Sequence, residues 1–154
     1  MSVDVGEIGL PAAVAPLSDH IGRLFLRAHR DFSERAIEKL RQRGHDRLGL
    51  AHTGLLAHLD GRPTRITTLA ERAALTKQAA GQIILDLEAQ GYVERAVDPA
   101  DRRAMLVTFT AAGRRFLRDA AEIKREIEAE YAAILGAERL RNLRAALETL
   151  LRDS

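Results

Sequence analysis

The sequence has no cysteine, no tryptophan and few aromatic residues of any kind. The absence of cysteine excludes disulfide bonds, thiolate metal sites, iron–sulfur clusters and thiol-based redox sensing. Because only 4% of the residues are aromatic, the core has to be built from leucine, isoleucine, valine and alanine. No apolar run approaches the ~18 residues that a membrane-spanning helix needs. Residues 1–16 carry Asp4 and Glu7 but no basic side chain, which does not fit a secretory signal. We therefore expect a cytoplasmic protein with no membrane partner.

A length of 154 residues suits one domain that is large enough to bury a core without disulfides or metals. Residues 1–15 show no hydrophobic periodicity, and they contain two glycines and a proline. We expect a flexible N-terminal tail over residues 1–15, followed by a single domain over residues 16–154.

Lysine is scarce in this chain, whereas arginine is abundant. The 24 basic residues include only three lysines, so 21 are arginines, and 22 acidic residues leave a net charge of +2. Residues 62–118 carry a net charge of +4, whereas the residues before them are neutral and those after them sum to −2. Guanidinium groups bind phosphates and guanine edges, so this distribution fits a central module that faces nucleic acid. A genome that favours arginine codons is an equally good explanation of the excess itself.

Apolar residues recur at helical spacing at both ends of the chain. Between residues 17 and 40 they predict a helix over about 17–43 that ends at Gly44. A second apolar stripe over residues 116–134 predicts a long helix that ends at Gly136, with a leucine-rich helix after it.

One compact module cannot cover all of the apolar surface that these terminal helices would present. We therefore expect the helices of residues 16–47 and 111–152 to pack against those of a second copy, since two-fold homodimers are the commonest oligomers. The alternative is a monomer in which these helices wrap the central module.

The central residues, 48–110, contain short predicted elements. Leucines predict a helix over about 51–59, which the Asp60–Pro63 segment breaks, and Ile66 is expected to lie in a minimal strand.

Two further short helices are predicted to form a helix-turn-helix. Thr68 and Glu71 have the spacing of a capping box, which predicts a helix over about 69–74. Thr76 is a predicted N-cap for a second helix over about 77–90. The tight turn between the two helices is typical of a helix-turn-helix. Its expected interior consists of Ala70, Leu75, Ile83, Ile84 and Leu87.

A β-hairpin is predicted directly after the second of these helices. Residues 92–97 and 105–109 have strand-like composition, and residues 98–104 between them begin with Asp-Pro, which initiates turns. A hairpin in this position is the wing of a winged helix, and it would carry Arg102 and Arg103 at its tip. A minor groove attracts guanidinium groups; the alternative is an ordinary polar hairpin loop. Asp98 and Asp101 are expected to pair with one arginine or to cap the turn.

The beginning of the predicted second helix is polar and has small neighbours. A recognition helix presents its N-terminal residues to base edges in the major groove, and glutamine, lysine and threonine can all make contacts there. The candidate DNA-binding residues of this helix are Thr76, Lys77, Gln78 and Gln82. Taken alone, these residues fit a solvated helix face equally well.

Three segments of this module, residues 87–95, 98–104 and 107–113, closely resemble the MarR family of bacterial and archaeal regulators. The resemblance covers residues 17–151 in the order of its elements and is specific over residues 65–113. It implies a mainly α fold with a small β-hairpin wing, in which a winged helix-turn-helix is flanked by long dimerisation helices. It also implies a homodimeric transcriptional regulator, commonly a repressor, that binds a pseudo-palindromic operator in double-stranded DNA.

The resemblance also implies roles for wing residues. Arg102 would be the arginine that enters the minor groove, with Asp101 and Arg103 shaping the wing, although the sequence leaves open which arginine inserts. Many members of the family release DNA when a small aromatic or anionic effector enters a cleft beside the winged module. No residue of this sequence can be singled out as an effector ligand.

Other functions have less support in the sequence. The five histidines include no i, i+4 pair, so no metal site is expected, and no cofactor is implied. No nucleophile elbow or phosphate-binding loop indicates an enzyme, and Glu126 and Glu130, at i, i+4 spacing, are interpreted as a solvated helix face. The alternative to a DNA-binding regulator is a winged-helix interaction module or anti-repressor that does not bind DNA.

Overall fold

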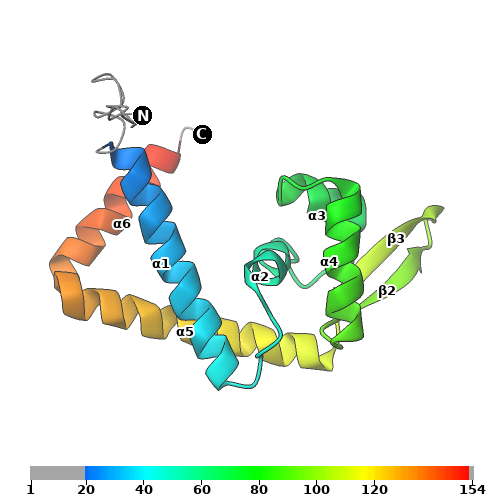
Figure 1. Cartoon of the computed structure of the whole chain (residues 1–154). Coiled ribbons are helices and arrows are strands. Elements are labelled where there is room, and N and C mark those ends of the chain that lie inside the picture. The colour runs from blue at the N-terminus through cyan, green and yellow to red at the C-terminus, as the bar shows by residue number, and fades with distance from the viewer. Residues whose placement is uncertain (1–19, 153–154) are drawn as a thin grey trace, which may run out of the picture. The chain divides into compact units, whose positions relative to one another are not determined.

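The computed structural model describes residues 20–152, so the predicted tail and the first residues of the predicted first helix lie outside the described residues. The elements are α1 (Ile21–Gln42), α2 (Leu50–Leu56), β1 (Thr64–Arg65), α3 (Ile66–Arg72), α4 (Lys77–Ala89), β2 (Val93–Asp98), β3 (Asp101–Phe109), α5 (Ala111–Leu135) and α6 (Ala137–Leu151) (Figure 1). This confirms the predicted fold class, which is mainly α with a small β-hairpin wing. The chain divides after Glu34 into two compact units.

The described part of the first unit, residues 20–34, is a stretch of α1 in which no residue is buried. Ile21, Leu24, Phe25 and Leu26 are all exposed apolar side chains. Within this stretch Arg30 donates to Glu34 one turn later at 2.7 Å, an exposed i, i+4 pair of the kind that contributes a few tenths of a kcal/mol.

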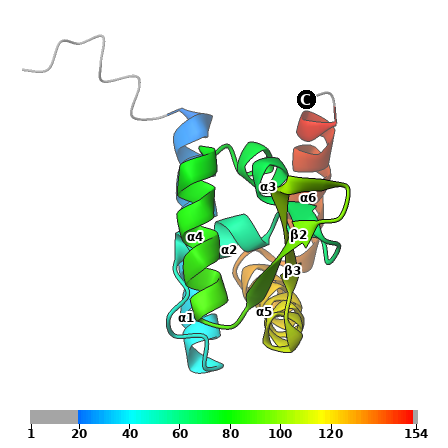
Figure 2. The same cartoon turned by 90° about the vertical axis from the view of Figure 1, so that its right-hand side faces the viewer.

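The second unit contains the winged-helix module, whose core lies between α2, α3, α4 and the sheet. Its buried apolar residues are Leu55, Leu56, Leu59, Leu69, Ala70, Ala80, Ile84, Leu87, Val93, Val107 and Phe109. The sheet has the order β1-β3-β2 and is antiparallel throughout. Figure 2 shows α4 beside the β2–β3 hairpin. Of the residues expected in this interior, Leu75 is 37% exposed and Ile83 is only partly buried.

The start of α3 differs from the prediction. The strand is β1, and it ends at Arg65, so Ile66 is the first residue of the helix rather than part of a strand. The capping box at Thr68 was also wrong, because α3 begins two residues before it and Arg65 occupies the N-cap without a side-chain bond. The pairing of Arg65 with Leu106 across the sheet fixes the entry to the helix, which a local capping pattern cannot report.

The second helix of the helix-turn-helix agrees with its prediction. α4 begins at Lys77, and the Thr76 hydroxyl caps it by accepting from the Ala79 N–H at 3.1 Å. The turn before it places Ala74 at φ 53°, in the left-handed region. The helix ends one residue earlier than expected, with Gln90 at the C-cap and Gly91 at φ 83°.

The hairpin has a shorter loop than its sequence suggested. Residues 101–104, expected in the loop, belong to β3, and only Pro99 and Ala100 lie between the strands. The tight turn forms because the Asp98 carboxylate accepts from the Ala100 N–H at 2.9 Å. Asp98 and Asp101 face each other across the hairpin.

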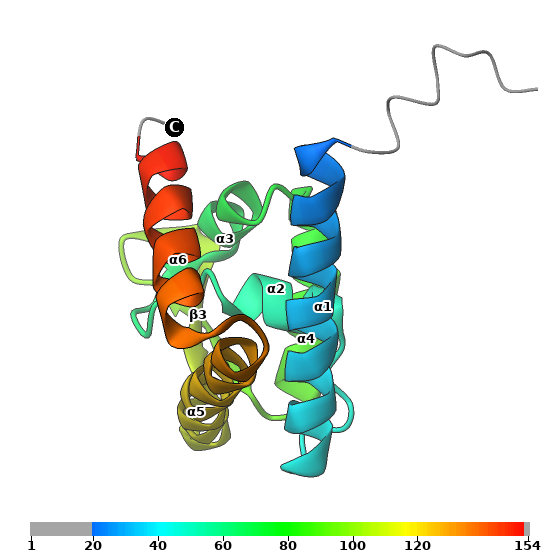
Figure 3. The same ribbon diagram turned by 90° about the vertical axis from the view of Figure 1, so that its left-hand side faces the viewer.

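The long helix α5 and the shorter α6 follow the predicted boundaries at Thr110 and Gly136. The Thr110 hydroxyl caps α5 by accepting from the Gly113 N–H. The predicted α5 stripe is divided: Ile127 is fully buried within the single chain, whereas Ile134 is 67% exposed. No residue of α6 is buried, and Figure 3 shows α6 rising from the end of α5.

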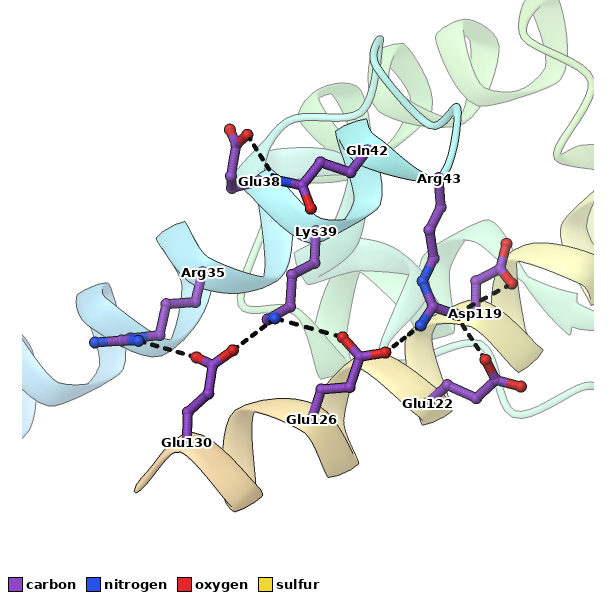
Figure 4. A network of polar contacts seen from close by, with 9 residues as sticks. All are labelled: Arg35, Glu38, Lys39, Gln42, Arg43, Asp119, Glu122, Glu126 and Glu130. Carbon is purple, nitrogen blue, oxygen red and sulfur yellow. Dashed lines mark hydrogen bonds and ion pairs between the residues drawn. The ribbon is translucent and has the colours of Figure 1, made fainter. Parts of the chain in front are cut away.

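A ladder of ion pairs joins the last turns of α1 to α5 (Figure 4). Arg35 contacts Glu130 at 2.9 Å, and Lys39 contacts Glu130 at 2.6 Å and Glu126 at 3.4 Å. The pKa of Glu130 is lowered, chiefly by the hydrogen bond from Lys39. Glu126 and Glu130 therefore do not form a purely solvated face, because both carboxylates connect two helices.

Candidate nucleic-acid interface

The N-terminal turns of α4 combine a buried inner face with an exposed polar outer face. Ala80 and Ile84 anchor the helix, being at most 1% exposed. The four residues predicted to contact base edges, Thr76, Lys77, Gln78 and Gln82, are all exposed. The structure therefore brings these side chains together on one accessible end of a well-anchored helix.

The wing begins at a buried carboxylate. Asp98 is 7% exposed and accepts from Arg65 at 2.8 Å from Nε and 2.6 Å from Nη2. The hydrogen bond from the Ala100 N–H, followed by the Arg65 side chain, holds the pKa of Asp98 below its usual range. Asp98 therefore fixes the hairpin turn to the β1–α3 junction. The sequence suggested that Asp98 pairs with a wing arginine or caps the turn; it caps the turn, and its arginine partner comes from another element.

The three wing residues predicted as DNA contacts occupy the first positions of β3. Asp101 accepts from the Arg103 backbone N–H at 3.0 Å and from its Nε at 3.4 Å. Arg103 nevertheless remains 93% exposed. The side chain of Arg102 is exposed and makes no hydrogen bond or ion pair within residues 20–152. The expected pairing of Asp101 with one arginine is therefore found, and the arginine is Arg103.

Two histidine-centred contacts support the module, and sequence reasoning missed both. His45 contacts the Tyr92 hydroxyl at 2.7 Å and Asp119 at 2.8 Å, and its ring packs edge-on against Phe116. Burial is the main cause that raises the pKa of Tyr92. The second contact joins His52 to Asp86 on α4 at 2.5 Å. The partners are 34 or more residues apart, and no local spacing predicts such pairs.

A small polar cavity of about 370 Å³ lies beside the β1–α3 junction. Its lining contains Asp60, Arg62, Pro63, Thr64, Arg65, Thr68, Arg72 and Leu106. Three arginines and one aspartate line it, so its wall favours an anion over a cation. In the part of the chain that the structure describes, no group of three or more His, Asp or Glu side chains could hold a metal ion.

Within residues 20–152, no helix is both long enough and apolar enough to cross a membrane.

Comparisons with known proteins agree with this architecture. Residues 48–104 match the model of the MarR family. The curated transcriptional regulator HosA of Escherichia coli O111:H- is 34% identical over 70 residues, which cover 46% of this chain and 52% of HosA. The match therefore spans about half the length of this relative.

Solved structures extend the likeness of fold over most of the chain. The apo form of MarR from E. coli has a TM-score of 0.74 at 20% identity, covering 86% of this chain and 98% of its own. A MarR regulator from Methanosarcina mazei has a TM-score of 0.73 at 22% identity, with coverages of 86% and 94%. A MarR-family regulator from Rhodococcus has a TM-score of 0.69 at 24% identity, with coverages of 87% and 94%. Residues 48–104 therefore match the MarR family of transcriptional regulators, and the chain as a whole shares the fold of that family's solved structures.

Proposed function

We propose that the protein is a homodimeric, sequence-specific DNA-binding regulator that represses genes from a pseudo-palindromic operator. The observation that carries this proposal is the exposed polar end of α4, which lies within a stretch, residues 62–118, that has a net charge of +4. Thr76, Lys77, Gln78 and Gln82 would contact the major groove, where glutamine pairs with adenine and lysine with guanine.

The wing would contact the neighbouring minor groove. Arg102 is the arginine proposed to insert, because its side chain is exposed and makes no polar contact within residues 20–152. Asp101 and Arg103 would shape the wing, since Asp101 holds Arg103. The narrow groove of A·T-rich DNA has the strongest negative potential for such a guanidinium group.

The proposed domain organisation is a DNA-binding module over residues 48–110, carried by dimerisation helices over residues 16–47 and 111–152. Support comes from exposed apolar side chains on these helices, among them Leu24, Phe25, Ile134, Leu143 and Leu150. A second copy would bury them, and two identical modules explain a two-fold symmetric operator.

The test is selection of bound sequences from a random duplex library with the full chain, followed by titration of the selected duplex. Arg102→Ala should weaken binding by about 1–3 kcal/mol and reduce the salt slope by about 1. Arg103→Ala is the matched comparison, and a larger loss there would reassign the inserted arginine. Failure to select any sequence would favour the winged-helix interaction module instead.

A small aromatic or anionic effector is proposed to release the DNA. The arginine-lined cavity beside β1 and α3 supports an anionic ligand. A screen of aromatic carboxylates for release of the selected duplex tests this proposal, and a complex that no compound dissociates would contradict it.

A further inference from the structure

One face of the recognition helix carries a polar residue at every fourth position, namely Gln78, Gln82, Asp86 and Gln90. Residues four apart are neighbours on a helix surface. The first two side chains are exposed and make no hydrogen bond to the part of the chain that the structure describes. The last two are held: Gln90 Nε2 donates to Asp86 at 3.1 Å and to the Arg47 carbonyl at 3.4 Å. The stripe thus has a free half toward the N-terminus and a fixed half behind it.

The fixed half is attached to α2 through His52, whose ring is bonded on both nitrogens. The Gly49 N–H donates to Nδ1 at 2.9 Å. Because a backbone N–H can only donate, Nδ1 carries the lone pair and the proton resides on Nε2. Nε2 therefore donates to Asp86 Oδ2, at 2.5 Å. One imidazole thus joins the backbone at the start of α2 to a carboxylate on α4.

This contact supplies a constraint that the packing of α4 does not. Ala80, Ile84 and Leu87 bury the inner face, but apolar burial is not directional. A hydrogen bond needs a narrow range of distances and angles, so it restricts rotation of α4 about its own axis. A rotation of about 10° moves a side-chain tip lying ~6 Å from the axis by about 1 Å. That displacement would misplace Gln78 and Gln82 at a base edge.

The charge of Asp86 strengthens this interpretation. A carboxylate on a helix that enters a DNA groove is repelled by phosphates, so its presence is unfavourable for affinity. The His52 hydrogen bond is the main cause that lowers the pKa of Asp86, so the carboxylate remains charged and able to accept. A carboxylate that weakens DNA binding at this position is explained if it holds α4 at one rotation about its axis.

We propose that His52 and Asp86 form a positioning pair that sets the rotation of α4 and thereby the sequence preference of the protein, without either residue contacting a base. This inference rests on the proposed function, because it assigns determinants of preference for the same interface. His52 is the informative member, since it lies on α2, only 18% exposed.

The experiment compares the affinity for the selected duplex with that for random duplex, using the full chain. His52→Asn keeps an oxygen that can accept from the Gly49 N–H, but its amide nitrogen does not reach the position of Nε2, so the hydrogen bond to Asp86 is lost. We expect the ratio of specific to non-specific affinity to fall about tenfold, the effect of losing one hydrogen bond to a charged group. Non-specific affinity should change little, and the melting temperature should fall by only a few degrees, because one hydrogen bond of the folded protein is lost.

Asp86 provides the reciprocal variants. Asp86→Asn keeps an acceptor and should preserve the ratio, whereas Asp86→Ala should lower it about tenfold. Both should bind random duplex more tightly, because a negative charge is lost. Glu71→Ala is the control, since it removes an exposed carboxylate of α3 that makes no hydrogen bond or ion pair within residues 20–152, and its ratio should remain within about twofold of the wild type.

The outcomes separate this inference from the proposed function. A wild-type protein that prefers no sequence would overturn the proposed function. A wild-type preference that survives in folded His52→Asn, or a loss in Glu71→Ala of equal size, would overturn the positioning pair. The ring nitrogen chemical shifts of His52 test the pair without DNA. An unprotonated Nδ1 and a protonated Nε2 are expected, and a proton on Nδ1 would contradict the assignment.

Discussion

The winged-helix module and α6 differ in how far their apolar side chains are buried within a single chain. The module buries most of its leucines, isoleucines and valines within a single chain, and its hairpin and helices close around them. α6 contains five leucines in 15 residues, yet none of its residues is buried. A module that completes its own core can fold around its binding face. A helix with an uncovered stripe requires another surface to cover it.

The difference shows which mutations should affect folding and which should affect assembly. α5 contains both kinds of position, because Ile127 is fully buried in the single chain whereas Ile134 is largely exposed. We therefore expect that substituting a residue buried within one chain lowers folding stability. Substituting an exposed residue of the same apolar stripe should weaken assembly instead.

The largest effect is expected at Ile127. Ile127→Ala removes buried methyl and methylene groups and leaves a cavity, so the free energy of unfolding should fall by about 2–5 kcal/mol. Leu143→Ala is the matched variant in α6, where the side chain is 47% exposed. It should leave unfolding of the single chain within about 0.5 kcal/mol of the wild type, but weaken self-association. Denaturant titration and sedimentation equilibrium measure the two quantities.

A result in which both variants unfold equally easily, with unchanged association, would remove the distinction between the two regions. It would mean that α6 is covered by its own chain in solution.

A second effect, of about 3 kcal/mol, is expected where α5 meets the hairpin. A Cβ at Gly113 would lie 2.0 Å from the Tyr92 carbonyl oxygen and 2.7 Å from Phe109 Cδ1. The carbonyl cannot move freely, because it accepts from the Thr110 N–H. Gly113→Ala should therefore destabilise the module by overpacking. Thermal unfolding monitored by circular dichroism measures the loss.

Gly54 is the control for that substitution, because it lies in α2 with open space around its Cβ position. Gly54→Ala should raise stability by about 0.5–1 kcal/mol, the difference in helix propensity between the two residues. Equal stability of the two variants would show that the contact of α5 with Tyr92 and Phe109 is loose.

Local patterns predicted the elements whose ends are determined by their own residues. Thr76 and Thr110 cap α4 and α5 as their positions before the helices indicated. The patterns failed where a distant partner decides. Arg65 pairs with Leu106 in the sheet, so the strand ends and α3 begins at other residues than predicted. The tight turn at Asp98 pairs Asp98 with Asp101, so Asp101 belongs to a strand and not to the predicted loop.

The candidate interface divides in the same way. The exposed end of α4 could be predicted because its residues are consecutive and follow a recognisable cap. Its supports could not be predicted, since His52 reaches Asp86 across 34 positions and Arg65 reaches Asp98 across 33. Such pairs are set by tertiary packing, which a single sequence does not reveal through spacing.

The smallest effect on stability is expected from titration of Asp98. At this position an ion pair with Arg65, rather than apolar burial, holds the hairpin to the rest of the module. Its pKa is lowered in the folded protein by the Ala100 N–H and by Arg65. The resulting stabilisation is present above the ordinary aspartate pKa and is lost as the pH falls through the lower folded value. Asp98→Asn can still accept from the Ala100 N–H but cannot form the ion pair with Arg65. The variant should therefore be less stable than the wild type at pH 7, and the two should converge as the pH falls below the lowered pKa of Asp98.

Asp60→Asn is the matched control, because that carboxylate is exposed and its nearest guanidinium nitrogen lies 3.9 Å away on Arg72. Its melting temperature should follow that of the wild type across the same range. Parallel curves for wild type and Asp98→Asn, with no convergence in acid, would show that Asp98 acts through the hairpin turn alone. The charge would then contribute nothing to the module, and its stability would rest on the apolar core that α6 lacks.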